Sequence, residues 1–160
     1  MKSINAKLFI HRDCTKIVNV VYSSDEYYKI VKENCENGLK QVIITSDMMT
    51  KILHDYFFQK KYNITGIEFM EDDSTLNREI NNILLKLKED RAYINDLLNK
   101  INFLSEESAI DIKMIELRGR DDQNQAVKIV ILVNGVYSIT DKVFEKESND
   151  LLAMIERCLC

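Results

Sequence analysis

The chain has 160 residues, of which 46% are hydrophobic, and it carries a formal net charge of −4 at pH 7. This apolar content is enough to build a core, which excludes an intrinsically disordered chain. The acidic balance excludes an overall positive field that would hold nucleic acid or an anionic membrane. No apolar run approaches the roughly 18 residues that a membrane helix needs, so we expect no membrane contact.

The N-terminus and the cysteines indicate the compartment. Residues 1–7 lack the apolar stretch of a secretory signal peptide. The four cysteines, Cys14, Cys35, Cys158 and Cys160, are too few and too scattered for a disulfide framework. We therefore expect a cytoplasmic protein.

Residues 1–72 form the first predicted region, a β-hairpin followed by β/α elements. Two runs rich in β-branched and aromatic residues flank the turn-like Asp13-Cys14-Thr15, which predicts the hairpin. Ser23 and Glu26 have the spacing of a capping box, and Asn37-Gly38 is a good helix stop. The predicted elements are strands at 6–12 and 16–22, a helix from 23 to 37, a strand at 41–45, a helix at 46–59 and a strand at 64–69.

The stretch from 73 to 105 contains neither Gly nor Pro and predicts one long amphipathic helix. Its apolar residues fall on the two seam positions of a seven-residue repeat, and Asp90 alone interrupts them. The seam residues are Leu76, Ile80, Ile83, Leu87, Ile94, Leu97, Ile101 and Leu104. Such a helix would be roughly 46 Å long. We expect it to join the N-terminal region to the C-terminal one.

This helix has three open interpretations. Leu84 and Leu98 widen the apolar stripe beyond a narrow coiled-coil seam, while Glu89-Asp90-Arg91 forms a polar waist between two apolar patches. The patches can be internal core, a self-association surface or a groove for a foreign helix. Asp90 should be solvated or paired, because an unpaired buried carboxylate would cost several kcal/mol.

Residues 106–160 predict a three-stranded antiparallel meander followed by a helix. The strands are expected at 110–117, 126–133 and 136–144, and the helix from about 148. Asn134-Gly135 between the last two strands is a strong hairpin signal of the type I′ kind. Since hairpins require antiparallel pairing, the fold class is α+β, and all three regions could still form one domain.

The sequence lacks a recognisable catalytic motif. His11 and His54 are the only histidines, and neither lies in a nucleophile motif. Four glycines are too few and too dispersed for a phosphate-binding loop. His11, Cys14 and the C-terminal Cys158-Leu159-Cys160 match no common zinc spacing. We therefore predict no enzyme activity, no cofactor and no metal site.

The leading prediction is a regulatory or accessory protein that binds another protein and forms a homodimer. The predicted contact residues are Ile94, Leu97, Leu98 and Ile101 on the helix and Arg118 and Arg120 on the hairpin. The first alternative is an accessory factor of a DNA transaction in a phage or mobile element, acting on a recombinase or inhibiting a host enzyme. Direct nucleic-acid contact is less favoured, because the basic features are short. The second alternative is a small-molecule sensor.

Overall fold

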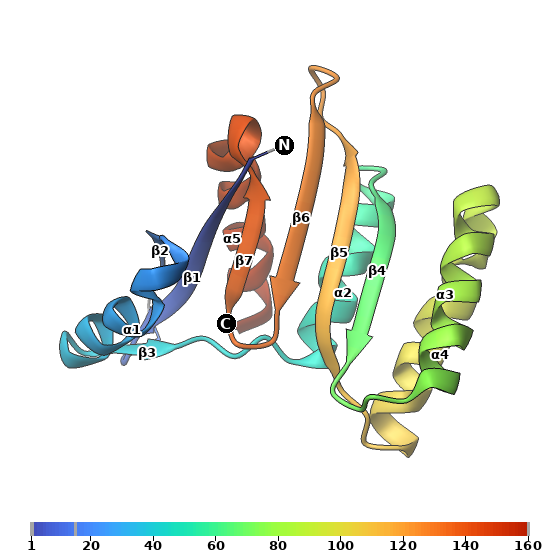
Figure 1. The fold of residues 1–160 in the computed structure, drawn as a ribbon, viewed down its shortest axis with the longest axis horizontal. Helices are drawn as coiled ribbons and strands as arrows, with labels where there is room; N and C mark the ends of the chain where they lie inside the picture. Colours follow the sequence, from blue (N-terminus) through green and yellow to red (C-terminus); the bar gives the residue numbers. More distant parts are fainter. Residues whose placement is uncertain (1, 15, 160) are drawn as a thin grey trace.

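The computed structural model describes residues 2–14 and 16–159 and confirms the α+β class, with helices packed on one antiparallel sheet of seven strands (Figure 1). The strands are β1 Ser3–His11, β2 Ile17–Tyr22, β3 Leu39–Gln41, β4 Asn63–Phe69, β5 Ile112–Arg120, β6 Ala126–Leu132 and β7 Val136–Thr140. The α-helices are α1 Tyr27–Glu36, α2 Ser46–Phe58, α3 Ser74–Glu89, α4 Ile94–Glu107 and α5 Phe144–Leu159. Both predicted hairpin regions are therefore present.

The strand order is β2-β1-β7-β6-β5-β4, and β3 also pairs with β1. β1 joins the N-terminal hairpin to β7, while β4 joins the other end of the meander through β5. Strands from residues 1–72 thus stand at both ends of the sheet, with the meander of residues 106–160 between them. The first and last predicted regions share one sheet and one core.

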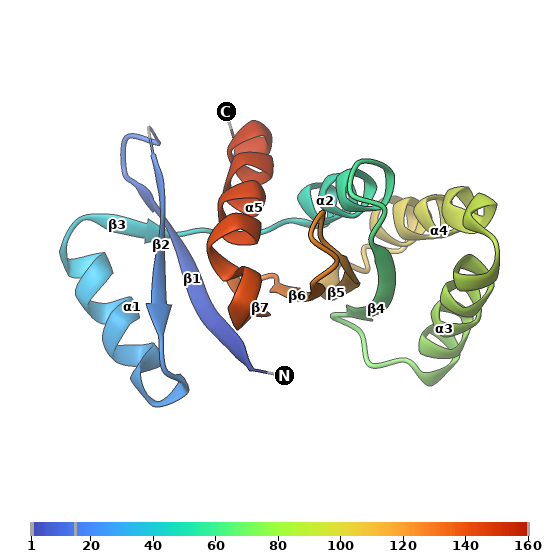
Figure 2. The ribbon, with the colours of Figure 1, turned by 90° about the horizontal axis from the view of Figure 1, so that it is seen from above.

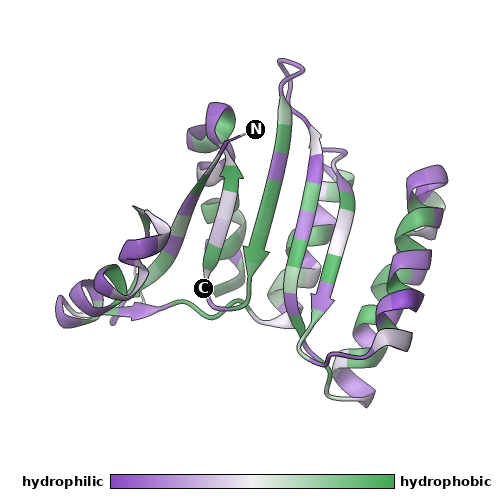
Figure 3. Cartoon of the chain, in the orientation of Figure 1, coloured by the Kyte–Doolittle hydropathy of each residue, from purple (hydrophilic) through white to green (hydrophobic). Residues whose placement is uncertain are grey.

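The helices cover the sheet unequally. Figure 2 shows α2 and α5 over one face, with α1 near one end of the sheet and α3 and α4 near the other. Figure 1 looks onto the opposite face, where no drawn helix crosses β5 and β6. Alternate residues Val127, Ile129 and Ile131 of β6 are buried in the core. Figure 3 shows β6 as a mostly hydrophobic strand next to a hydrophilic hairpin loop.

The prediction of a single helix over 73–105 is wrong, because the chain breaks at the polar waist. Asp90 has an extended backbone, and its carboxylate accepts a hydrogen bond from the Ala92 N–H, as a helix N-cap does. The break brings the ammonium nitrogen of Lys100 in α4 within 2.9 Å of a carboxylate oxygen of Glu79 in α3. A straight helix would hold these two residues roughly 30 Å apart. The two helices therefore form a hairpin beside β4 and do not connect two lobes.

Arg91 holds the turn between α3 and α4 against α2. Its guanidinium donates a hydrogen bond of 2.6 Å to the carbonyl oxygen of Phe57 and lies 3.7 Å from the centre of the Phe57 ring. This contact combines a charge-assisted hydrogen bond with a cation–π interaction. The break in the helix is thus fixed by contacts on both sides, by Asp90 locally and by Arg91 with α2.

Three further local predictions differ from the structure. The last strand, expected at 136–144, ends at Thr140, and the final helix begins at Phe144 and not near 148. The apolar residues 42–44 form irregular chain after the short strand β3, although Val42 and Ile44 are buried. The turn between β6 and β7 has three residues, and only Gly135 among them has a positive φ, of 81°. It is therefore not the type I′ turn that was predicted. The N–H of Leu8 donates to the Gly135 carbonyl, so β1 helps to hold this turn.

Candidate protein-interaction site

The apolar residues predicted as contacts on the long helix lie mostly inside the molecule. Ile94, Leu97 and Ile101 belong to the main hydrophobic core, and Leu97 and Ile101 are almost completely buried. Leu98 is half-buried and packs against the same core. The patch that was predicted as a contact surface is therefore packed into the core in this structure, which agrees with the first of the three interpretations left open above.

The two predicted arginines lie elsewhere, on strand β5, and do not join those helix residues. Arg118 is exposed and forms an ion pair of 3.6 Å with Glu116, which Lys128 also approaches at 3.4 Å. Arg120 donates a hydrogen bond of 2.9 Å to the carbonyl oxygen of Asn124, within the hairpin loop. Both guanidinium groups thus make contacts within their own hairpin.

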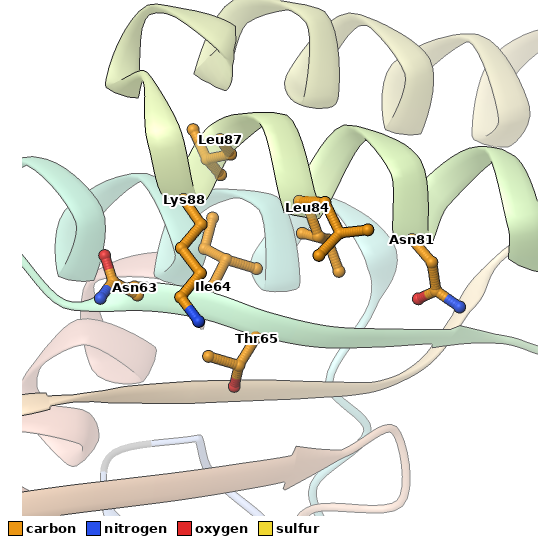
Figure 4. Close-up of a pocket in the computed structure, with 8 residues that line it drawn as sticks. Asn63, Ile64, Thr65, Asn81, Leu84, Leu87 and Lys88 are labelled. Atoms are coloured by element: carbon orange, nitrogen blue, oxygen red, sulfur yellow. The ribbon is translucent and has the colours of Figure 1, made fainter.

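A groove between α3 and β4 forms an apolar depression on the surface of the molecule. β4 is the last strand of the sheet, and Figure 4 shows Leu84 and Lys88 of α3 pointing toward it from the side away from β5. This part of the groove has a volume of about 330 Å³. It is lined by Asn63, Ile64, Thr65, Asn81, Leu84, Leu85, Leu87 and Lys88. We call it the α3–β4 groove.

The groove has a buried apolar floor and an exposed apolar rim. Ile64, Leu84 and Leu87 are buried and belong to the core. Leu85, by contrast, keeps 65% of its surface exposed. An exposed leucine beside an apolar floor offers a partner area to bury without unfolding the protein.

A second depression continues the α3–β4 groove along the rest of the strand. It shares Asn81 with the first part and reaches Met70, which is 59% exposed. Its lining residues are Gly66, Ile67, Glu68, Phe69, Met70, Glu71, Asp72, Asn77, Asn81, Lys113 and Met114. The combined groove therefore follows β4 over its whole length.

The strand in this groove has a free backbone edge. β4 pairs with β5 alone, and among residues 2–14 and 16–159 no other backbone group hydrogen-bonds to the residues of β4. A helix cannot supply such bonds, because its own N–H and C=O groups bond to each other. The outward N–H and C=O groups of β4 are thus left to water or to an added strand.

The two ends of the groove differ in charge. Lys88 lines the end near Asn63. Three carboxylates, those of Glu68, Glu71 and Asp72, line the other end together with one lysine, Lys113. A ligand that lies along the groove would therefore meet a positive group at one end and a net negative group at the other.

A buried polar cluster lies at the start of α5. The fully buried carboxylate of Glu147 accepts hydrogen bonds from the Lys60 ammonium at 2.7 Å and the Tyr62 hydroxyl at 2.5 Å. Lys60 also pairs with Asp150 at 2.5 Å. Burial, followed by the hydrogen bond and the charge of Glu147, raises the pKa of Tyr62. Because these groups satisfy one another, the cluster ties the loop between α2 and β4 to the start of α5.

The described residues show neither a metal centre nor a membrane segment. Within 2–14 and 16–159, no group of three or more His, Cys, Asp or Glu side chains is placed to hold a metal ion. Cys160, considered above with Cys158, lies outside the described residues. None of the described helices combines the length and the apolar character needed to cross a bilayer.

These features define a mixed α+β protein with one antiparallel sheet and a groove along one sheet edge. Comparison of the chain with protein-family models, with curated proteins and with solved structures gave no match.

One signal for the groove was present in the sequence. Leu84 and Leu85 are adjacent, and neighbouring residues are separated by about 100° around a helix. On a helix with a single apolar stripe, such a pair indicates that one of the two leucines lies near the border of the stripe. Nothing local indicated that this border would adjoin the free edge of β4, because that placement depends on the whole sheet.

Proposed function

We propose that the chain is a non-catalytic regulatory or accessory protein that binds a partner protein through the α3–β4 groove. The occupant is an extended segment of the partner, which lies along β4 and hydrogen-bonds to its free edge. Addition of a strand to an exposed sheet edge is a recurring mode of peptide recognition. The observation that carries the proposal is a free strand edge lined by an apolar, partly exposed groove.

The length of β4 and the charges at the two ends of the groove indicate the length and charge pattern of the partner segment. The seven residues of β4 span about 23 Å at roughly 3.3 Å per residue, so a segment of about seven residues matches it. An apolar side chain of the segment would cover Leu85. Complementary charge places an acidic residue at the Lys88 end and a basic residue near Glu71 and Asp72.

The test uses a random heptapeptide library displayed on phage and panned against the immobilised full-length protein. Enriched peptides are synthesised with a fluorescent label, and their affinity is measured by anisotropy. We expect Leu85→Asp to weaken binding at least about tenfold, because it removes apolar contact and adds a charge at the rim. Phe103→Asp is the matched control, since Phe103 is also exposed but lies on α4 and does not line the groove.

Hydrogen exchange supplies an independent readout of the binding mode. Saturation with an enriched peptide should slow exchange of backbone amides within Asn63–Phe69, because added-strand pairing occupies the free edge. The proposal fails if no peptide is enriched, or if Phe103→Asp weakens binding while Leu85→Asp does not. Binding without added protection in β4 would contradict pairing with this edge.

A further inference from the structure

The other end of the sheet has a free edge of a different kind. β2 pairs with β1 alone, and no further backbone hydrogen bond from the described residues reaches Ile17–Tyr22. Helix α1 lies against the sheet face that carries Lys7, since the Lys7 ammonium is 5.5 Å from the centre of the Tyr27 ring. α1 therefore covers a face of this hairpin, and the outward backbone groups of β2 are left without a strand.

The sequence of β2 lacks the usual protection of a free edge. Its six residues, Ile-Val-Asn-Val-Val-Tyr, contain no charge, no proline and no glycine. Natural edge strands generally carry charges, proline or bulges, or lie beneath a helix, because an unprotected edge pairs with other chains. β4 at the other end of the sheet differs from β2, because it contains Glu68, has shifts of register in its pairing with β5 and has α3 beside it. A neutral edge strand rich in β-branched residues favours association with a strand of another chain.

Exposed apolar side chains accompany this edge. Val21 is 55% exposed, and Tyr28 at the start of α1 is 85% exposed. Tyr27 links this tyrosine to the strand, with ring centres 5.3 Å from Tyr28 and 5.5 Å from Tyr22. The surface formed by β2 and the first turn of α1 thus combines a free backbone edge with exposed apolar groups on both faces of the sheet, because Val21 shares the face of Ala6 and Tyr28 lies on the face that α1 covers.

We propose that this surface binds a second copy of the chain, through antiparallel pairing of β2 with β2 across a two-fold axis. Directly opposite residues of an antiparallel pair point to the same side of the sheet. A register centred on Val20 satisfies this condition and places Val18 of each copy opposite Tyr22 of the other. Such aromatic and β-branched pairs are favourable across strands.

A second copy fits this edge better than a charged partner does. The strand is neutral, and pairing with itself in this register places Val18, Val20 and Tyr22 of the two copies together on one face of the sheet, as a two-fold interface allows. Pairing would also provide hydrogen-bond partners for the outward backbone groups of β2 in both copies, and it would make one continuous sheet through the dimer. Six residues and one helix turn form a small interface, so we expect a dimer that dissociates on dilution.

The test is light scattering coupled to size exclusion over a concentration series of the full-length protein. We expect a concentration-dependent dimer for the wild type and a folded monomer for Val21→Lys, because a lysine on an edge strand opposes pairing with another strand. Val21→Thr is the matched control, since it keeps the β-branched shape without charge and should shift the monomer–dimer midpoint by less than about tenfold. Circular dichroism checks that Val21→Lys is folded.

Two results overturn this proposal. One is a wild type that stays monomeric at every concentration. The other is a wild-type dimer that Val21→Lys leaves intact, because the contact would then use a different surface. Leu85→Lys at the opposite edge should leave the dimer unchanged, which separates this interface from the peptide site in the α3–β4 groove.

Discussion

At the scale of single residues, Lys7 is the most unusual side chain in the structure. It is completely buried, and its ammonium donates a hydrogen bond to the backbone carbonyl of Asn134. The rings of Phe9 and Tyr27 lie 5.9 Å and 5.5 Å away, within cation–π range. Burial lowers the pKa of Lys7, and the nearby thiol of Cys35 opposes this shift more weakly.

We expect Lys7→Met to stabilise the protein by about 1 kcal/mol at pH 7, because methionine fills similar space without a charge to desolvate. The pKa of Lys7 is lower in the folded chain than in the unfolded one, so its protonation favours unfolding. The destabilisation by the lysine charge is fully present below the folded pKa and disappears as pH rises toward 10.5, the ordinary pKa of lysine. The advantage of Lys7→Met should therefore shrink over this alkaline range.

Urea unfolding of both proteins at several pH values measures this effect. Lys7→Ala is the control for volume, and it should be less stable than Lys7→Met because it leaves a cavity. A Lys7→Met protein that is less stable than the wild type at pH 7 would contradict the prediction. It would mean that the bond to Asn134 and the two ring contacts outweigh desolvation.

At the scale of elements, the break between α3 and α4 shows what periodicity can and cannot predict. The periodicity correctly indicated the apolar face of this stretch, since most of the seam residues from Leu76 to Leu104 are buried in the core. The repeat does not reveal whether two apolar stretches lie end to end or fold back on each other. Asp90, within the polar waist, was the local sign of the break. The contact between Arg91 and Phe57 joins distant parts of the sequence, so no local pattern could reveal it.

Leu97→Asp is expected to unfold the protein, because Leu97 has no exposed surface. Removal of a buried leucine costs about 2–5 kcal/mol, and a buried unpaired carboxylate adds several more. The sum is comparable to the whole stability of a domain. Thermal circular dichroism should show no cooperative transition for this variant.

Asn99→Asp is the matched control on the same helix, since Asn99 is exposed and the substitution introduces the same charge. Its melting curve should resemble that of the wild type. A Leu97→Asp protein that melts cooperatively near the wild-type temperature would contradict the core assignment and restore this side chain as a surface contact.

At the scale of the whole molecule, the α+β class and the hairpins followed from local signals, whereas the strand order did not. Turn residues and alternating apolar residues occur within short segments, so they are visible in the sequence. The pairing of β1 with β7 joins residues more than a hundred positions apart, as in Ala6 with Tyr137. A sheet pairing of this range has no local pattern, and it determines which edges stay free.

Strand order also determines the unit that folds, and we expect residues 1–72 alone to remain unfolded. In the full chain, β1 and β4 each pair with a strand from residues 112–140, and the core includes Ile129 and Ile131 of β6. The fragment would lose both partners and expose the apolar face that they cover. Calorimetry should show one cooperative transition for the full chain and none for the fragment. A cooperative transition in the isolated fragment would make residues 1–72 a domain of their own, with the shared sheet a contact between two folded units.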